Sequence, residues 1–338
     1  MLGILQPALP GPGYTIGSMR ALRFHSYGPP DVLRIDDLPE PSPGVGQVKV
    51  RVQAVALNPL DSKIRAGHLR FIPLFRSPPR GVGTDFAGEI VGIGEGTSAR
   101  RVGERVFGSL SPFGREGALA DIIVVPDDGV LPIPQNVDAA QAACLPVAGG
   151  TALQALTDES HVLPDQWVLI TGAAGGVGHF AVQIAKSFRA YVVAVCSAGN
   201  AAFARELGAD EVVDYAREDF TRRNDRFDVI FDAASASSFA AARPVLDESG
   251  VYINTSGDAA ALIGTAASAL VARFTSSQRA VPFVLRNDAG MWRRLLEFVR
   301  ERGLRAHIER TIALEDVAAA QRAMETGHGR GKIVVRLG

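Results

Sequence analysis

The sequence has few residues that could hold a metal ion or form disulfide bonds. Its 338 residues include two cysteines, Cys144 and Cys196, and six histidines, none of which forms a pair at metal-ligand spacing. Two widely separated cysteines do not make a disulfide framework, which favours a reducing compartment, so we expect a cytoplasmic protein. No run of about 18 apolar residues is present, and we therefore expect no transmembrane helix.

An excess of charge of one sign is also absent. Lysine and arginine number 35 and aspartate and glutamate 36, which gives a net charge of −1. Proteins that bind nucleic acid concentrate basic residues on one face, so nucleic acid is not an expected partner. The content of 47% hydrophobic and 21% charged residues is that of a globular protein, and the length favours two domains.

Residues 1–18 differ in composition from the rest of the chain. They contain four glycines and three prolines, and they lack the basic start and sustained apolar core of a secretory signal. We expect a flexible N-terminal extension, with the first ordered segment opening at Met19.

The remaining chain changes its pattern twice. Residues 19–137 consist of short β-branched runs separated by glycine and proline, which predicts a compact, barrel-like antiparallel domain. Residues 138–280 begin with an alanine-rich helical stretch, interrupted near Pro146 to Gly150, and continue with fully apolar strands that alternate with helices. This alternation predicts a parallel sheet covered on both faces. Residues 281–338 contain no further phosphate loop, and we expect them to return to the first domain.

The strongest local motif is TGAAGGVG, from Thr171 to Gly178, between an apolar strand and a helix. A dinucleotide site needs glycine where the backbone turns tightly and approaches the pyrophosphate, and the helix start then offers N–H groups to the phosphates. Ala173 replaces the first glycine of the G-x-G-x-x-G pattern, whereas the other two glycines remain. The residues expected to bind the cofactor here are Ala174, Gly175, Gly176, Val177 and Gly178.

The end of the next strand indicates which nicotinamide cofactor is used. NAD sites place a carboxylate about 20 residues after the turn, but Val195 to Ala198 reads VCSA. The missing carboxylate favours NADPH, and Ser197, Asn200 and Tyr215 are expected beside its 2′-phosphate. No basic residue stands at this point, so Arg205 or Arg217 would have to supply one. A site that accepts either cofactor stays open.

Six segments, taken together, resemble a known family from Met19 to Leu337. The chain resembles the medium-chain dehydrogenase/reductase superfamily, and within it the zinc-free quinone oxidoreductases, including the reticulon-interacting mitochondrial enzymes. The segments are ALNPLDSKIRAG (56–67), GTDFAGEIVGIG (83–94), LPVAGGTALQAL (145–156), ITGAAGGVG (170–178), ELGADEVVDY (206–215) and GHGRGKIVV (327–335).

This resemblance implies an α/β fold of two domains with the active site in the cleft between them. A GroES-like β-rich barrel domain would comprise residues 19–137 and 281–338, and a Rossmann domain with a doubly wound parallel sheet residues 138–280. It also implies a homodimer joined through the Rossmann sheet edges. Where zinc-dependent relatives place cysteine and histidine ligands, this chain has Asn58 and Thr84, which are poor zinc ligands, so no metal is expected.

The implied activity is transfer of hydride from NADPH to a quinone or an α,β-unsaturated carbonyl compound, that is, to a small, hydrophobic, electron-poor partner. The resemblance places Asn58 near the nicotinamide, Asp61 and Lys63 close behind it, and Thr151 against the nicotinamide ribose or amide. Further residues assigned to the cofactor are Thr255, Ser256, Gly257 and Lys332.

Each of these assignments has a structural alternative. Asp61 could be only a helix cap, Lys63 only a solvated side chain, and Arg330 and Lys332 only flanks of an edge strand. Two alternatives for the whole protein also remain, namely an enoyl reductase of a biosynthetic pathway and an NADPH-binding regulatory protein with little turnover. No general acid is identified from the sequence.

Overall fold

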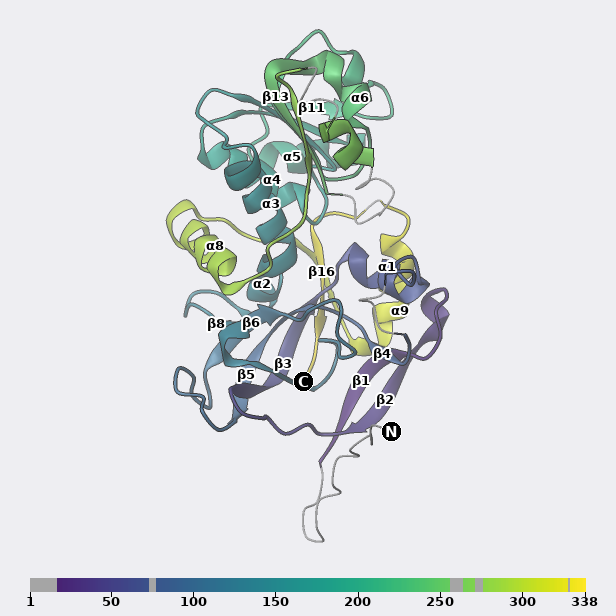
Figure 1. Cartoon of the computed structure of the whole chain (residues 1–338), viewed down its shortest axis with the longest axis vertical. Coiled ribbons are helices and arrows are strands. Elements are labelled where there is room, and N and C mark those ends of the chain that lie inside the picture. Colours follow the sequence, from purple (N-terminus) through teal and green to yellow (C-terminus); the bar gives the residue numbers. More distant parts are fainter. Residues whose placement is uncertain (1–16, 73–76, 256–263, 271–275, 328) are drawn as a thin grey trace.

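The chain folds into two lobes built on different kinds of sheet, as the computed structural model shows (Figure 1). The structure describes residues 17–72, 77–255, 264–270, 276–327 and 329–338. Antiparallel strands dominate the lobe that contains the C-terminus, and a parallel sheet forms the other lobe. Helices α2, α3 and α8 lie between the two sheets in this view.

The antiparallel lobe contains a three-stranded and a seven-stranded sheet. The first has the order β2-β1-β4, and the second the order β15-β16-β3-β5-β6-β8, with β7 paired to β3. Their bounds are β1 Ser18–Phe24, β2 Leu33–Pro39, β3 Gln47–Ala56, β4 Arg80–Gly81, β5 Asp85–Ile93, β6 Arg105–Ser109, β7 Ile122–Pro126, β8 Val130–Pro132, β15 Ile308–Ile312 and β16 Lys332–Arg336.

The pairing of the long strands β3 and β5 is irregular. Their register shifts between Lys49 and Val50 and again between Val52 and Ala54. Gly88 lies beside the second shift, and a side chain there would collide with the backbone carbonyl of Arg51. The bulges and this glycine give the close backbone approach that a barrel-like sheet requires.

The parallel lobe has the strand order β11-β10-β9-β12-β13-β14. The chain therefore starts in the middle, runs to one edge, and returns to build the other half, which is the doubly wound order of dinucleotide-binding domains. Val168, Leu169 and Ile170 of the central strand are fully buried because helices cover both faces. The bounds are β9 Trp167–Thr171, β10 Tyr191–Cys196, β11 Glu211–Asp214, β12 Phe227–Asp232, β13 Leu246–Asn254 and β14 Arg279–Pro282.

The helical stretch after the antiparallel lobe continues through the place where an interruption is expected. Two wide π-helical turns, Leu145–Gly149 and Ala155–Glu159, follow short α-helical pieces instead of a break. Such turns release backbone groups from the regular ladder, and the N–H of Val147 donates to Asp85 at 3.1 Å. The helices are α1 Pro59–Ala66, α2 Ala139–Ala143, α3 Gly150–Gln154, α4 Gly178–Ser187, α5 Ala201–Glu206, α6 Phe239–Ala242, α8 Ala289–Arg302 and α9 Val317–Met324.

The C-terminal segment returns to the antiparallel lobe. β16 pairs antiparallel with β3 and parallel with β15. The expected boundary between residues 280 and 281 falls inside β14, so the parallel sheet extends to Pro282. The expected extension over residues 1–18 lies almost entirely outside the described residues, and β1 begins at Ser18, one residue earlier than expected.

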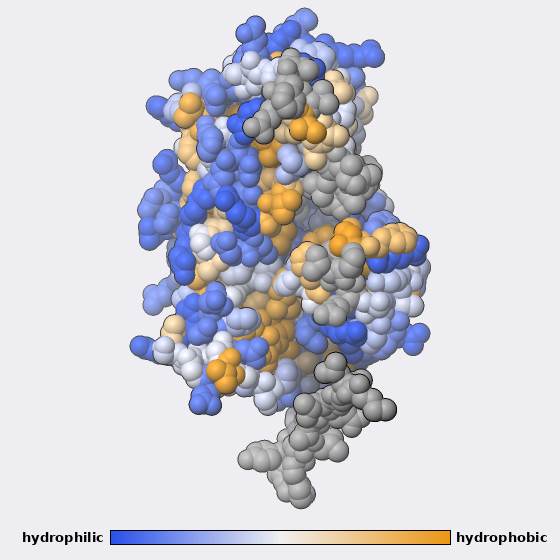
Figure 2. All heavy atoms as spheres, in the orientation of Figure 1, coloured by the Kyte–Doolittle hydropathy of each residue, from blue (hydrophilic) through white to orange (hydrophobic). Residues whose placement is uncertain are grey.

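The surface seen in Figure 2 is mixed, with hydrophilic residues around the rims of both lobes and hydrophobic residues nearer the middle of this face. None of the helices in the described ranges is long and apolar enough to span a membrane.

Candidate active site

The turn between β9 and α4 is shaped by two glycines. Gly172 has a φ of 58°, in the left-handed region, and its carbonyl accepts a hydrogen bond of 2.8 Å from the N–H of Gly175. A side chain on Gly178 would collide with that same carbonyl of Gly172. Ala173, at the position usually taken by the first glycine, is fully buried and fits without strain. The turn therefore has the close packing of helix on strand that a phosphate loop needs.

The start of α4 is arranged to receive an anion. The helix begins directly after the turn that follows β9, so the positive end of its dipole lies beside the crevice at the carboxyl end of that strand. This crevice lies between β9 and β12, where the strand order reverses, which is the place where open parallel sheets bind their ligands. The geometry accordingly fits a dinucleotide pyrophosphate.

Arg330 contacts the residues that follow the end of β10. Its guanidinium donates to Asn200 Oδ1 at 2.9 Å and to the carbonyl of Gly199 at 3.0 Å, and it stands over the ring of Phe203. Ser197 directly follows β10, and Tyr215 follows β11 with 55% of its surface exposed. The sequence suggests Arg205 or Arg217 as the cation here. Arg330 is a further candidate, which the sequence does not indicate because 130 residues separate it from Asn200.

A buried polar cluster surrounds Asn58 at the start of α1. The amide of Asn58 donates to Asp85 Oδ2 at 3.0 Å, and its Oδ1 accepts from the ammonium of Lys332 at 2.6 Å. Thr84 Oγ1 and the carbonyl of Ala56 lie farther from the amide nitrogen, both at 3.4 Å. Asn58, Thr84, Asp85 and Lys332 are all at most 6% exposed. The structure thus brings Asn58 and Lys332 together, although the sequence assigned them to different roles.

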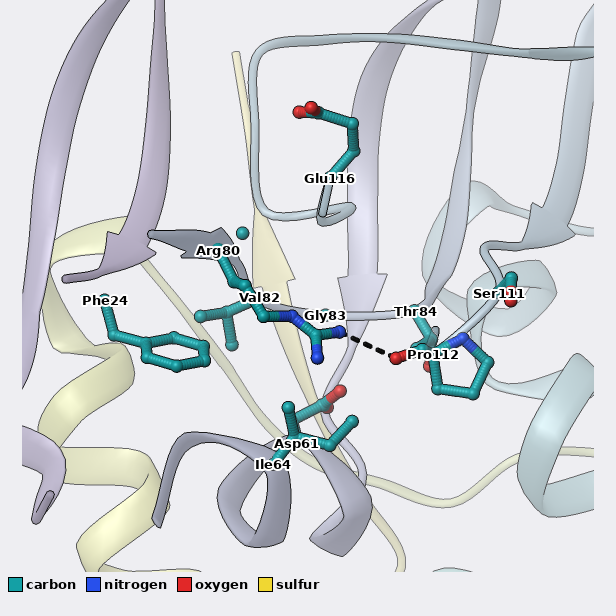
Figure 3. A pocket seen from close by; sticks show the side chains of 11 residues that line it. Phe24, Asp61, Ile64, Arg80, Val82, Gly83, Thr84, Ser111, Pro112 and Glu116 are labelled. Atoms are coloured by element: carbon teal, nitrogen blue, oxygen red, sulfur yellow. Dashed lines mark hydrogen bonds between the residues drawn. The ribbon is translucent and has the colours of Figure 1, made fainter. Parts of the chain in front are cut away.

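Asp61 is a helix cap and also lines a small hollow. Its Oδ2 accepts the N–H of Asn58 at 2.8 Å, completing a capping box. Figure 3 shows its carboxylate directed into the hollow toward Arg80, whose guanidinium donates to the carbonyl of Pro112 at 2.7 Å. The hollow has a cavity volume of about 20 Å³. It therefore admits water but not a ring-shaped acceptor.

Burial raises the pKa of Asp61 to about 7, although the Asn58 N–H opposes the rise. The folded chain thus binds more protons than the unfolded chain between about pH 4 and pH 7, so the free energy of unfolding should fall as pH rises through that range. Asp61→Asn keeps the acceptor for Asn58 but cannot ionise. We expect it to gain stability relative to the parent chain between pH 5 and pH 8, by up to about 4 kcal/mol.

Thermal unfolding of both chains at pH 5 and pH 8 measures this difference. Asp37→Asn, on the exposed surface of β2, is the matched control and should show no such dependence. A constant stability difference between Asp61→Asn and the parent at the two pH values would contradict the assignment.

The remaining predicted residues are described by their burial and by their own hydrogen bonds. Thr151 is buried in α3 and Lys63 is half-buried in α1; neither is among the described residues that hydrogen-bond to Asn58. Thr255 follows β13, and its N–H donates to the carbonyl of Asp232 at 3.3 Å. Ser256 and Gly257 lie outside the described residues.

Asp232 is the centre of a second buried network at the carboxyl ends of the parallel strands. Its carboxylate accepts from Thr171 Oγ1 at 2.5 Å and from the hydroxyl of Tyr252 at 2.8 Å. It also accepts the N–H groups of Ala236 and Ser237, at 2.8 and 2.9 Å. These bonds fix the loop after β12 beside the crevice. Tyr252 is a poor proton donor here, because burial and the Asp232 charge raise the pKa of its hydroxyl.

Two family models match separate parts of the chain. Residues 44–135 match the alcohol dehydrogenase GroES-like domain, and residues 207–335 match a family described as zinc-binding dehydrogenase. A chloroplast envelope quinone oxidoreductase homolog of Arabidopsis thaliana is 35% identical over 94% of this chain and 98% of its own. The chain belongs to the medium-chain dehydrogenase/reductase superfamily.

Within this superfamily the chain is quinone oxidoreductase-like and is an oxidoreductase. The solved structure of the quinone oxidoreductase from Coxiella burnetii has a TM-score of 0.84 and 31% identity, and covers 95% of this chain and 100% of its own. An NADPH-dependent alkenal/one oxidoreductase of Arabidopsis thaliana is 29% identical over 94% of this chain and 79% of its own. The GroES-like and Rossmann parts expected from the sequence are both present.

The donor set of this medium-chain reductase does not fit zinc. Asn58 and Thr84 are neutral, and the positively charged ammonium of Lys332 already contacts Asn58 Oδ1. No group of three or more histidine, cysteine or acidic residues that could hold a metal occurs in the described ranges.

Proposed function

We propose that this chain transfers hydride from NADPH to a quinone or to an α,β-unsaturated carbonyl compound, with no metal ion. The observation that carries the proposal is the Asn58–Lys332–Asp85 cluster, which is buried, lies beside the phosphate turn and contains no set of zinc ligands. An acceptor that is already electron-poor needs no Lewis acid, and relatives named for quinones and alkenals support this class of acceptor.

NADPH is the proposed cofactor because of the charges around the end of β10. Neither Cys196 nor Ser197 offers a carboxylate to repel a phosphate, and Arg330 presents a guanidinium at that point. Ser197, Asn200 and Tyr215 stay proposed contacts of the 2′-phosphate. Residues Ala174 to Gly178 stay proposed contacts of the pyrophosphate, and Thr151, Thr255, Ser256, Gly257 and Lys332 of the nicotinamide end.

When bound, NADPH supplies the hydride, and the residues of the chain orient the acceptor and stabilise the charge that develops on its oxygen. One N–H of the Asn58 amide is held by Asp85, whereas the other has neighbours only at 3.4 Å. That second N–H, together with the hydroxyl of Thr84, is the proposed donor pair for the acceptor oxygen. Their fixed geometry avoids reorganisation when charge builds up.

Asp61 is the proposed source of the proton that follows the hydride. With a pKa of about 7 it is part protonated near neutral pH, which suits a general acid. Thr84 lines the same hollow, and exposed Ser111 and Glu116 stand at its outer side, so a water molecule there would connect Asp61 with solvent (Figure 3). Lys63, half-buried on the same helix, stays a predicted neighbour of the site.

The homodimer also stays a proposal. β14 is the last strand in the described order of the parallel sheet, and Val284 just beyond it is 71% exposed. Pairing of two β14 edges would extend the sheet and cover this residue.

The direct test is acceptor-dependent oxidation of NADPH by the purified chain. We expect turnover with 1,4-benzoquinone, 9,10-phenanthrenequinone or a simple enone, and much slower turnover with NADH. Turnover with a thioester-linked enoyl substrate alone would identify an enoyl reductase. Tight NADPH binding without oxidation by any acceptor would instead support a regulatory NADPH-binding protein.

A further inference from the structure

Lys332 is an unusual residue in this chain, both in type and in position. It is one of four lysines, and only 3% of it is exposed. Its ammonium donates to the carbonyl of Leu57 at 2.7 Å and to Asn58 Oδ1 at 2.6 Å. Burial of an ammonium is unfavourable unless it is paired, so a side chain that only filled space at this position would be expected to be apolar.

The two charged neighbours of Asn58 allow only one orientation of its amide. An ammonium can only donate, so it requires the amide oxygen, whereas Asp85 Oδ2 accepts, as it also does from the N–H of Val147, so it requires the amide nitrogen. Lys332 and Asp85 lie on these two sides, at 2.6 and 3.0 Å. Rotating the amide by 180° would place its NH₂ group against the ammonium of Lys332 and its oxygen against the carboxyl oxygen of Asp85. Lys332 thereby determines which way the N–H groups of Asn58 point.

The same network balances charge in the buried site. Asp85 is fully buried, which raises its pKa, whereas Lys332 and the hydrogen bond from Asn58 act in the opposite direction. The N–H of Val147, from the π-helical turn, is a further donor to the same carboxylate oxygen. The amide of Asn58 thus connects the buried ammonium to the buried carboxyl group of Asp85, and removal of the ammonium would raise the pKa of Asp85 further.

Lys332 also touches the cofactor-binding lobe. The N–H of Gly331 donates to the carbonyl of Ala174 in the phosphate turn at 2.7 Å. A side chain added to Gly176 would lie 3.4 Å from Lys332 Cδ, so the lysine stem runs along that turn. Arg330, two residues before Lys332, reaches the end of β10. Three consecutive residues therefore contact the proposed 2′-phosphate region, the phosphate turn and Asn58.

We propose that Lys332 is a positioning residue, which fixes the amide of Asn58 so that its second N–H faces the acceptor oxygen when cofactor is bound. This inference rests on the proposed function of Asn58. It differs from a role for Lys332 as a cofactor contact alone, because its effect on turnover passes through the Asn58 side chain.

A double-mutant cycle tests this route. Lys332→Met keeps the aliphatic stem and removes the charge. We expect it to lower kcat by about 30- to 100-fold in the parent chain, with the Kd for NADPH changed by less than about threefold, because orientation rather than binding is lost. In the Asn58→Ala background, the same substitution should lower kcat by less than about threefold further. An equal loss in both backgrounds, or a large rise in Kd with unchanged kcat, would overturn the proposal.

A second measurement does not depend on turnover. The chain contains six asparagines, so selective ¹⁵N-asparagine labelling gives six pairs of side-chain amide signals, and Asn58→Ala identifies the pair of Asn58. We expect Lys332→Met to shift that pair, and Lys49→Met, in an ion pair with Glu40, to leave it unchanged. If Lys332→Met shifts the Asn58 signals but the parent chain oxidises no NADPH, the contact between Lys332 and Asn58 is supported and the proposed function is contradicted. An unmoved pair would overturn the contact itself.

Discussion

Arg330→Gln is expected to raise the KM for NADPH by about 30- to 100-fold and to leave the KM for NADH within about twofold. The guanidinium stands at the end of β10, bonded to Asn200 and Gly199, where it can make charge-assisted hydrogen bonds to a 2′-phosphate. NADH has no phosphate at that position, so the substitution removes no hydrogen bond to it and its KM should stay the same. The measurement is the steady-state rate of oxidation of each cofactor at a saturating quinone concentration.

Arg205→Gln is the matched control, because Arg205, on α5, is one of the two cations that the sequence alone suggests, the other being Arg217. If Arg205→Gln weakened the preference for NADPH over NADH and Arg330→Gln did not, the 2′-phosphate site would lie at α5 instead. If Arg330→Gln raised the KM for NADPH and the KM for NADH equally, Arg330 would only support the loop after β10.

Gly178→Ala is expected to abolish cofactor binding, with a rise in Kd for NADPH of more than about 100-fold, or to prevent stable folding. The added carbon would meet the carbonyl oxygen of Gly172 and lie 2.7 Å from Ala173 Cα, so the turn would have to open. Quenching of NADPH fluorescence gives the Kd, and circular dichroism shows whether the chain is folded.

Gly129→Ala serves as the comparison, because an added carbon there comes no nearer than 3.7 Å to another heavy atom. Gly129 lies between β7 and β8 in the antiparallel lobe, so this variant should bind NADPH like the parent chain. Normal NADPH binding by a folded Gly178→Ala variant would show that the turn from Thr171 to Gly178 is not the phosphate site.

The sequence predicts best those features that local patterns determine. Alternation of apolar strands with helices, and glycines between β9 and α4, locate the parallel sheet and the phosphate turn because both depend on neighbouring residues. Asn58 and Asp61 are close in the sequence, and their capping box follows directly from that spacing.

The sequence does not predict contacts between segments that are far apart. Lys332 lies 274 residues from Asn58, and no local period indicates that their side chains meet. The Asp232 network and the position of Arg330 likewise depend on the order of strands in space. The π-helical turns near Pro146 were expected as a break, because a proline without an N–H looks the same in sequence whether the helix ends or widens.

The central claim is that the chain passes a hydride from NADPH to an electron-poor carbon, and isotope labelling tests it most directly. The purified, chelator-treated chain is supplied with NADPH carrying deuterium on both C4 positions and with a simple enone, and the product is examined by mass spectrometry and NMR. We predict one deuterium at the β-carbon and a slower rate than with unlabelled NADPH. Reduction without deuterium in the product, or activity that disappears on chelation and returns with zinc, would contradict the claim.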